Sequence, residues 1–258
     1  MFTNTFFADT WWVCWRELKH LLGQKMRVFM TLFQPFMWLT LMGNLFERVA
    51  MIPGFPASKY LDYMTPGIVV MVTLFAGMFG GMSIVWDRRL GFFQKLLAAP
   101  ISRAAVVAGK MLAIGIQTAF QAVVILVIAW GMGVRFEAGP VGILPLAVLA
   151  FLLSTVFAGL SLSLGAVLTS HEALIAVVNF LTMPVVFTSN AMMPLDLMPD
   201  WLAGLATWNP LSYAINPMRG LFLNGWAWNE LLTGAVVLAL VSLVTGGLAT
   251  TLIRRSLA

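Results

Sequence analysis

Six long apolar stretches restrict the folds open to this chain. A membrane-spanning helix needs about 20 largely apolar residues, because about 30 Å of hydrocarbon is crossed at about 1.5 Å per residue. The stretches run approximately over 27–48, 64–86, 104–132, 141–168, 173–191 and 231–253. They are continuously apolar rather than alternating, which argues against a transmembrane β-barrel. We therefore predict an all-α integral membrane protein with six transmembrane helices.

Composition agrees with a membrane location. Of 258 residues, 60% are hydrophobic and 10% are charged, whereas a soluble globular protein carries about 25% charged residues. Too few charges remain to cover a water-facing surface. The single cysteine, Cys14, excludes an internal disulfide and a cysteine-rich metal site. No cleavable signal peptide is evident, so we expect the first span itself to direct insertion.

Basic residues indicate the orientation. With a cytoplasmic N-terminus, eleven lie inside or at the inner boundary: Arg16, Lys19, Lys25, Arg27, Arg88, Arg89, Lys95, Arg103, Lys110, Arg254 and Arg255. Four lie outside: Arg48, Lys59, Arg135 and Arg219. This positive-inside bias accounts for the net charge of +5 more economically than nucleic-acid binding does. We expect both termini in the cytoplasm and a multi-pass protein of a bacterial plasma (inner) membrane.

An amphipathic helix is predicted before the first span. Apolar residues recur at i, i+4, i+7 and i+11, namely Trp11, Trp15, Leu18 and Leu22. Arg16 and His20 fall toward the opposite side. The pattern favours a helix over residues 9–24 in the cytoplasmic interface, with the tryptophans in the headgroup zone. The alternative is an extension of the first span.

A broken segment separates the fifth and sixth spans. The stretch "MMPLDLMPDWLAGLATWNPLSYAINPMRGLFLNGW" contains Pro194, Pro199, Pro210 and Pro217. It is too apolar for a free loop and too interrupted for a spanning helix. We predict short helices at the outer interface, which could dip into the membrane. The simplest partition is one membrane domain over 1–258, with an interfacial helix (1–25), six spans (27–253), a cytoplasmic loop (87–103) and a re-entrant outer segment (192–229).

The loop "WDRRLGFFQKLLAAPISR" (86–103) interrupts the apolar sequence with charge. Asp87 is a predicted N-cap, and Pro100 prevents a short helix from running into the next span. One face of that helix would carry Phe92, Phe93, Leu96 and Leu97, framed by Arg88, Arg89, Lys95 and Arg103. Such a surface suits either a groove on another protein or an anionic lipid surface. The residues alone leave both open.

Two motifs resemble those of the type-2 ATP-binding-cassette exporters, in the group of daunorubicin-resistance and nodulation lipo-oligosaccharide exporters. One is the charged pair, Gly91, an apolar helix and "LLAAPISR" in the loop. The other is the late series Pro194-Leu195, Pro199, Trp201-Leu202, Asn209-Pro210-Leu211-Ser212-Tyr213 and Arg219. Two departures stand out: Asp87 where the family usually has Glu, and Asn216 where it tends to carry an acid. The second leaves an ion pair of Arg219 in doubt.

The resemblance implies half of a transport pore, driven by two copies of a separate ATP-binding subunit that holds ATP and Mg. The N-terminal helix and the loop would contact that subunit. The coupling residues would be Asp87, Arg88, Arg89, Gly91, Phe92, Phe93, Leu96, Pro100 and Arg103. The chain would pair with a second copy of itself or with a related membrane subunit.

Other chemistries lack the residues they need. The Gly109-Lys110 pair is followed by Met111 and has no glycine at position 104, so no phosphate-binding loop is present in the sequence. We expect no ATP hydrolysis by this chain alone. Paired acids of ion-coupled carriers are missing from the spans. His20 and His171 are isolated and are expected to be boundary residues rather than metal ligands.

Neutral polar residues within the spans are candidate pore-lining groups: Gln34, Asn44, Gln117, Gln121 and Asn179, beside Thr182. Hydrogen bonding between helices is the alternative role. Gly77 and Gly81 form a G-x-x-x-G pattern that permits close helix contact. Pro35 and Pro184 are expected to kink their helices.

We interpret the chain as the transmembrane subunit of an ATP-powered exporter. Its substrate would be apolar or amphipathic, such as a drug, a lipid or a lipid-linked glycan, because the spans offer no fixed charge to an ionic ligand. One alternative is a membrane-embedded lipid-modifying enzyme using Asp196, Asp200 and Tyr213. Another is an ATP-independent channel or scaffold.

Overall fold

Helices form every regular element in the part of the chain that the structure describes. The computed structural model describes residues 3–51, 57, 59–91, 101–168, 170–191, 195 and 198–255. The elements are α1 (Thr3–Gly23), α2 (Lys25–Leu45), η1 (Glu47–Met51), α3 (Tyr60–Met78), α4 (Met82–Arg89), α6 (Arg103–Gly131), η2 (Pro140–Gly142), α7 (Ile143–Val167), α8 (His171–Phe187), α9 (Asp200–Trp208), α10 (Pro210–Leu223) and α11 (Trp228–Arg255). The predicted all-α fold is confirmed.

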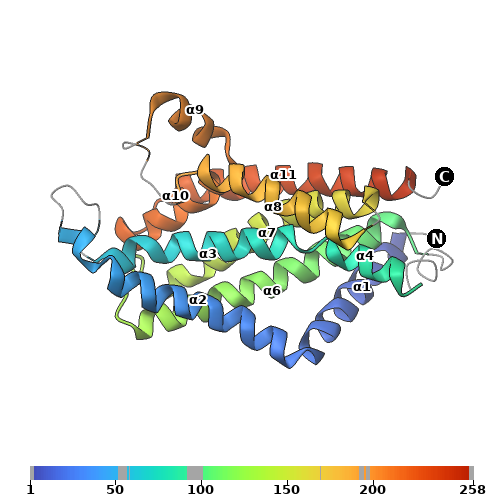
Figure 1. Ribbon diagram of the computed structural model, residues 1–258, viewed down its shortest axis with the longest axis horizontal. Helices are drawn as coiled ribbons and strands as arrows, with labels where there is room; N and C mark the ends of the chain where they lie inside the picture. The colour runs from blue at the N-terminus through green and yellow to red at the C-terminus, as the bar shows by residue number, and fades with distance from the viewer. Residues whose placement is uncertain are drawn as a thin grey trace.

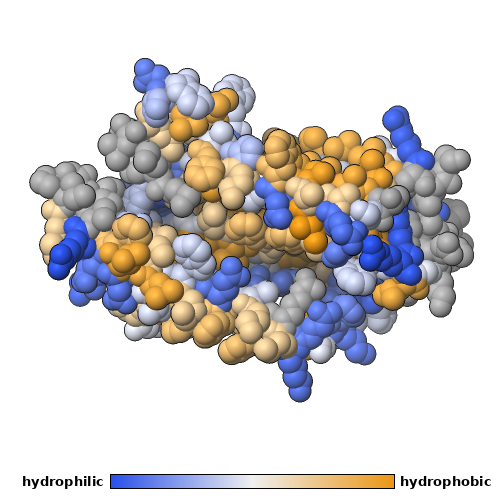
Figure 2. All heavy atoms as spheres, in the orientation of Figure 1, coloured by the Kyte–Doolittle hydropathy of each residue, from blue (hydrophilic) through white to orange (hydrophobic). Residues whose placement is uncertain are grey.

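The long helices run along the long axis of the molecule, and α7 lies at the centre of the bundle (Figure 1). It packs against α3, α6 and α11. Alanine, leucine and serine supply most of its buried side chains, so neighbouring helices approach it from several sides. Strongly hydrophilic residues gather at the two ends of the long axis and at the junction of α1 with α2, with broad apolar areas between them (Figure 1 and Figure 2). This distribution suits a bundle that crosses a bilayer along that axis.

Both chain termini lie at one end of the bundle, which we call the terminal end; the opposite end is the far end (Figure 1). The α2–α3 and α6–α7 connections lie at the far end, whereas α7 and α8 are joined at the terminal end. The predicted return of the C-terminus to the side of the N-terminus agrees with this arrangement. That the terminal end is cytoplasmic stays a prediction from the basic residues. Helix α1 crosses the terminal end obliquely, and α9 projects away from the bundle.

Five segments within the described residues have the length and hydropathy of a membrane span: Val28–Leu45, Tyr60–Arg89, Arg103–Gly131, Pro140–Val167 and Trp228–Arg255. They correspond to five of the six predicted spans. The remaining one, 173–191, corresponds to α8, which is apolar but has 17 residues. Both α2 and α8 continue through their prolines, Pro35 and Pro184. Short helices α9 and α10 occupy the segment before the last span, as predicted.

The second predicted span, 64–86, is not one continuous helix. Helix α3 ends at Met78 and α4 begins at Met82, with a turn over residues 79–81. A serine of α7 stabilises the break, because the Ser161 hydroxyl accepts the amide of Gly81 at 2.9 Å and donates to the carbonyl of Met78. A Cβ on Gly81 would lie 2.1 Å from the Ser161 carbonyl oxygen. The continuous apolar run concealed this turn.

Gly77 also requires close packing against α7. Its Cβ, if present, would lie 2.7 Å from both the Ser154 carbonyl oxygen and Phe157 Cβ. Such contacts are shorter than van der Waals distances, so only glycine allows α3 to approach α7 this closely. The predicted role of the Gly77 and Gly81 pattern in close helix contact is confirmed.

Replacing Ser161 by alanine tests the stabilised break. We expect Ser161→Ala to cost about 1–3 kcal/mol of stability, because a buried amide and a buried carbonyl lose their partner. The matched control is Ser163→Ala, since Ser163 is also buried but its hydroxyl donates to the carbonyl of Gly159 within the same helix, α7; that change should cost less than about 0.5 kcal/mol. Equal thermal unfolding midpoints of the two variants in detergent would contradict this role of Ser161.

Candidate functional site

A lysine with almost no solvent access lies about two turns into α6. Lys110 is 1% exposed, although lysine is almost never fully buried unless it is paired. Its neighbour Gly109 lets α1 approach closely: a Cβ there would lie 2.7 Å from the carbonyl oxygen of Thr10 and from Val13 Cβ. Helix α1 therefore covers the lysine from the bundle surface.

The Lys110 ammonium group joins three helices. It donates to a carboxylate oxygen of Glu17 on α1 at 2.7 Å and to one of Asp87 on α4, also at 2.7 Å. A third bond, of 3.1 Å, reaches the hydroxyl of Ser83 on α4. All three ammonium protons thus have an acceptor. This satisfies the condition under which a buried charge is tolerated.

Arg16 completes the site, and we call these five residues the charge cluster (Arg16, Glu17, Ser83, Asp87 and Lys110). Its guanidinium group lies 3.2 Å from Asp87 and also bonds to Glu17. Two cations therefore face two carboxylates. Burial raises the pKa of the Glu17 carboxyl, but Lys110 and Arg16 outweigh burial, so its pKa lies below the ordinary value. Glu17 accordingly remains ionised and keeps its attraction to Lys110.

The charged triplet after Trp86 fixes the end of α4 to its neighbours. Asp87 binds into the charge cluster, and Arg88 donates to the carbonyl of Ala166 at 2.8 Å. Ala166 lies in the last turn of α7, where carbonyls lack a helical partner. Arg89 lies 3.6 Å from Glu172 at the start of α8; because both side chains are exposed, this ion pair adds little to the stability of the fold. Four helices thus hold the end of α4.

The prediction that Asp87 is an N-cap is wrong, because Asp87 lies inside α4. The helix ends at Arg89 with Leu90 as its C-cap; Gly91 follows with a φ of +66°, which suits glycine, and its amide donates to the carbonyl of Arg88 at 3.0 Å. The N-cap of the next helix is Ser102, whose hydroxyl accepts the amide of Ala105. Phe92, Phe93, Leu96 and Pro100 lie outside the described residues, and Arg103 is the first residue of α6. Their coupling role stays a prediction.

Helix α1 divides into two faces. Thr10, Val13 and Cys14 are buried against the bundle, on the side from which Glu17 reaches Lys110. Trp11, Trp15 and Leu22 are exposed, and Leu18 is half-buried. The amphipathic helix is confirmed, and its exposed tryptophan face is free to contact an interface.

The Asn-Pro motif attaches α10 to α8. The Asn209 side chain accepts the amide of Leu211 and so caps α10, while Pro210 takes the first helical position. The same side chain donates to the carbonyl of Val185 at 2.7 Å and to the Thr188 hydroxyl at 3.0 Å. Asn209 therefore supplies hydrogen-bond partners to a backbone amide at the start of α10 and to a carbonyl and a hydroxyl at the end of α8.

Arg219 binds carbonyl groups instead of a carboxylate. Its guanidinium donates to the carbonyl of Asn190 at 3.2 Å and 3.3 Å and to that of Ala191 at 3.4 Å. It also lies over the ring of Tyr63 on α3, 4.1 Å from the centroid. Asn216 bonds to the Asn190 side chain. The asparagine at position 216 therefore belongs to a neutral network, and Arg219 ties α10 to α3 and to the segment after α8.

Comparison with known proteins settles the family. A family model described as ABC-2 type transporter matches residues 8–223, from α1 to the end of α10. The chain belongs to the ABC-2 type transporter family.

Similar proteins are permeases by name. A putative transport permease, ycf38, of Cyanophora paradoxa is 32% identical over 192 residues, covering 74% of this chain and 66% of that protein. The probable multidrug ABC transporter permease YbhR of Escherichia coli strain K12 is 26% identical over 202 residues, covering 78% and 54%. The daunorubicin resistance ABC transporter permease protein DrrB1 of Streptomyces coeruleorubidus is 26% identical over 167 residues, covering 63% and 58%. The chain thus matches between about half and two thirds of the length of these relatives.

The remaining predicted residues of this ABC-2 family member differ in their exposure. Of the candidate pore-lining residues, Gln34, Asn44 and Asn179 are exposed, Gln117 is half-buried and Gln121 is buried. In the outer segment, Trp201 is exposed on α9, Tyr213 is half-buried on α10, and Pro194 lies outside the described residues. A pore-lining role stays a prediction.

Metal and hydrolytic chemistry find no support in the described part of this ABC-2 family member. No group of three or more His, Cys, Asp or Glu residues that could hold a metal ion occurs among the residues in view. His171 packs edge-on against Trp86, with ring centroids 5.1 Å apart. Asp200 is the first residue of α9, Tyr213 lies on α10, and Asp196 lies outside the described residues.

The sequence analysis missed the pairing of Glu17 with Lys110. It assigned Lys110 to the inner boundary, and the partners are 93 residues apart. A signal was available: a lysine several residues inside a long apolar run needs a carboxylate, and Glu17, in the predicted interfacial helix, and Asp87, just after the second predicted span, both lie on the predicted inner side.

Removing the lysine tests the charge cluster. We expect Lys110→Met to cost up to about 3 kcal/mol, because Glu17 and Asp87 would lose the buried cation between them and keep only the half-exposed Arg16; their own partial exposure places the loss at the low end of the range for broken buried pairs. Adding Glu17→Gln and Asp87→Asn should restore most of the thermal unfolding midpoint. A triple variant no more stable than Lys110→Met would contradict this account.

Proposed function

We propose that this chain is the membrane-spanning subunit of an ATP-powered exporter, driven by separate ATP-binding subunits that carry ATP and Mg. Family membership and the multidrug and drug-resistance names of relatives support the proposal. The observation that carries it is the charge cluster. It joins α1, α4 and α6 at the terminal end and includes Asp87, the first residue of the predicted coupling loop at 87–103.

The contacts at the end of α4 couple the predicted loop mechanically to the helix bundle. Asp87 holds α4 to α1 and α6, and Arg88 holds it to the end of α7. A displacement of the loop by an ATP-binding subunit would therefore move packed helices instead of a free segment. Because α7 packs against α3, α6 and α11, such a displacement would reach most of the spans. Alternating access needs mechanical continuity of this kind.

The proposed substrate is apolar or amphipathic. Between Tyr63 and Trp86, between Met111 and Val134, and from Leu231 to Ile253, the sequence contains no charged residue. A charge at the bilayer centre costs about 2.5–3.5 kcal/mol on insertion scales, so these helices offer no fixed charge to an ionic ligand. Hydrophobic drugs, lipids and lipid-linked glycans fit this environment.

We further propose that the chain pairs with a second copy or a related subunit, each with one ATP-binding subunit. Few residues of α2 and α11 are buried within the chain. On α11, large apolar side chains are exposed at i, i+4, i+8, i+11 and i+12: Leu232, Val236, Leu240, Leu243 and Val244. Such a surface suits lipid or another membrane subunit.

The test is ATP-dependent transport of a hydrophobic dye in proteoliposomes that contain this chain and an ATP-binding subunit that co-purifies with it. We expect transport by the pair and none by either component alone. Phe92→Asp with Phe93→Asp should lower co-purification of the ATP-binding subunit at least about tenfold, because two charges would be buried in the proposed interface.

The control alters two exposed aromatic residues of α9, Trp201→Asp with Trp208→Asp, on the predicted outer side. This variant should co-purify with the ATP-binding subunit like the unaltered chain. Undiminished co-purification of the Phe92 and Phe93 variant would overturn the coupling role, and transport without ATP would overturn the proposed function.

A further inference from the structure

The connection between α6 and α7 is held rigidly at the far end of the bundle. The amide of Arg135 donates to a carboxylate oxygen of Asp62 on α3 at 3.3 Å. The amides of Glu137 and Ala138 donate to the carbonyls of Phe222 and Leu221 in the last turn of α10, both at 3.2 Å. Trp226 Nε1 donates to the carbonyl of Ala138 at 3.2 Å. Hydrogen bonds thus fix the backbone that carries the side chains of this connection.

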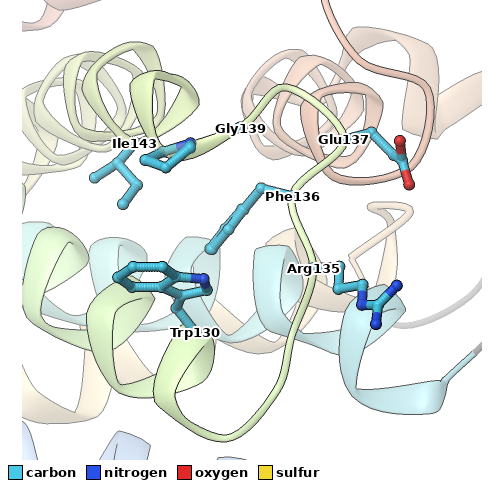
Figure 3. Close-up of a pocket in the computed structure, with 7 residues that line it drawn as sticks. Trp130, Arg135, Phe136, Glu137, Gly139 and Ile143 are labelled. Carbon is cyan, nitrogen blue, oxygen red and sulfur yellow. The ribbon is translucent and has the colours of Figure 1, made fainter.

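A cavity of about 230 Å³ opens beside this connection. Trp130, Phe136 and Ile143 turn toward one another on one side of the backbone (Figure 3). Arg135 and Glu137 extend from the other side of the same backbone, one above the other in the view, and both belong to the lining of the cavity (Figure 3). The cavity therefore has an aromatic part and a rim that carries one positive and one negative charge.

An apolar stripe on α6 leads to this cavity. Ile116, Phe120, Val127 and Trp130 are all exposed, and their spacing of i, i+4, i+11 and i+14 places them on one face. The stripe lies within the segment Arg103–Gly131, which is long and apolar enough to span a membrane. Trp130 ends it where tryptophan is favoured, at the boundary of the hydrocarbon. Along α6 the order is thus apolar stripe, aromatic cavity, charged rim.

The two charges of the rim are available to a ligand. Arg135 and Glu137 are both exposed, and neither forms an ion pair within the part of the chain that the structure describes. A phosphate group suits a guanidinium, and an ammonium group suits a carboxylate beside aromatic rings.

We propose that this surface binds one phospholipid with a zwitterionic headgroup from the leaflet at the far end. The acyl chains lie along the α6 stripe, and the glycerol region packs between Trp130 and Phe136. The phosphate pairs with Arg135 and the ammonium with Glu137. An anionic phospholipid supplies no cation for Glu137, and a diacylglycerol leaves both charges unpaired. The inference requires only membrane embedding and holds whether or not the chain exports a substrate.

Native mass spectrometry of the protein from nanodiscs with equal phosphatidylethanolamine and phosphatidylglycerol tests the proposal. We expect one phosphatidylethanolamine retained per chain, at about tenfold preference. Glu137→Gln removes the partner of the ammonium and should reverse the preference toward phosphatidylglycerol. Arg135→Gln should lower retention of both lipids about tenfold. Glu137→Asp should keep the original preference.

The matched control is a second adjacent pair of exposed opposite charges, Glu47 and Arg48 on η1. Glu47→Gln and Arg48→Gln should leave the lipid ratio unchanged. Thermal unfolding of every variant, followed in the same detergent, should match the unaltered chain, because these side chains are exposed. Equal retention of the two lipids by the unaltered chain, or a preference insensitive to Glu137→Gln, would overturn the proposal. Any lipid retained would then be bound non-specifically at the protein surface.

Discussion

The neutralisation of the Lys110 ammonium group by two carboxylates is the interaction on which the terminal end of this protein depends. A lysine that is 1% exposed inside a helix bundle requires charged partners within hydrogen-bond distance. Glu17 and Asp87 supply them from two different helices. This pairing places conditions on the neighbouring helices. Position 109 must be glycine so that α1 can approach α6, and α4 must be placed so that Asp87, near its end, points toward Lys110. One buried charge thus determines how three helices meet.

At the far end a cation is stabilised by uncharged groups instead of carboxylates. Within the described residues Arg219 forms no ion pair with a carboxylate; backbone carbonyls after α8 and the face of Tyr63 stabilise its guanidinium. Asn209 likewise uses one side chain to satisfy the start of α10 and the end of α8. Helix ends that carry unpaired carbonyls are common in membrane proteins with broken helices, and cationic or amide side chains can satisfy them. The family match extends over both ends of the bundle.

Local patterns in the sequence predicted much of this architecture. Apolar runs located the spans, the tryptophan spacing located α1, and closely spaced prolines marked the short helices α9 and α10. Contacts between distant residues were not predictable in this way. The residues next to Gly81 in the sequence do not indicate that Ser161 stabilises a helix break, and those next to Asp87 do not indicate that its partner lies in α6. Asp87 was therefore predicted to be an N-cap, and for Arg219 the sequence put an ion pair in doubt without indicating its carbonyl partners. The apolar part of the predicted coupling loop, 92–100, lies outside the described residues, so its contact surface rests on the sequence.

We expect the charge cluster to make α1, α4 and α6 move as one unit. The most direct measurement is the distance between spin labels at the exposed positions Trp12→Cys and Leu90→Cys, in a Cys14→Ala background, with the ATP-binding subunit bound to ADP or to a non-hydrolysable ATP analogue. The account predicts one narrow distance distribution that is the same in both nucleotide states, and a broadened distribution once Lys110→Met is added. A distance that changes between the nucleotide states while Lys110 is intact would contradict it.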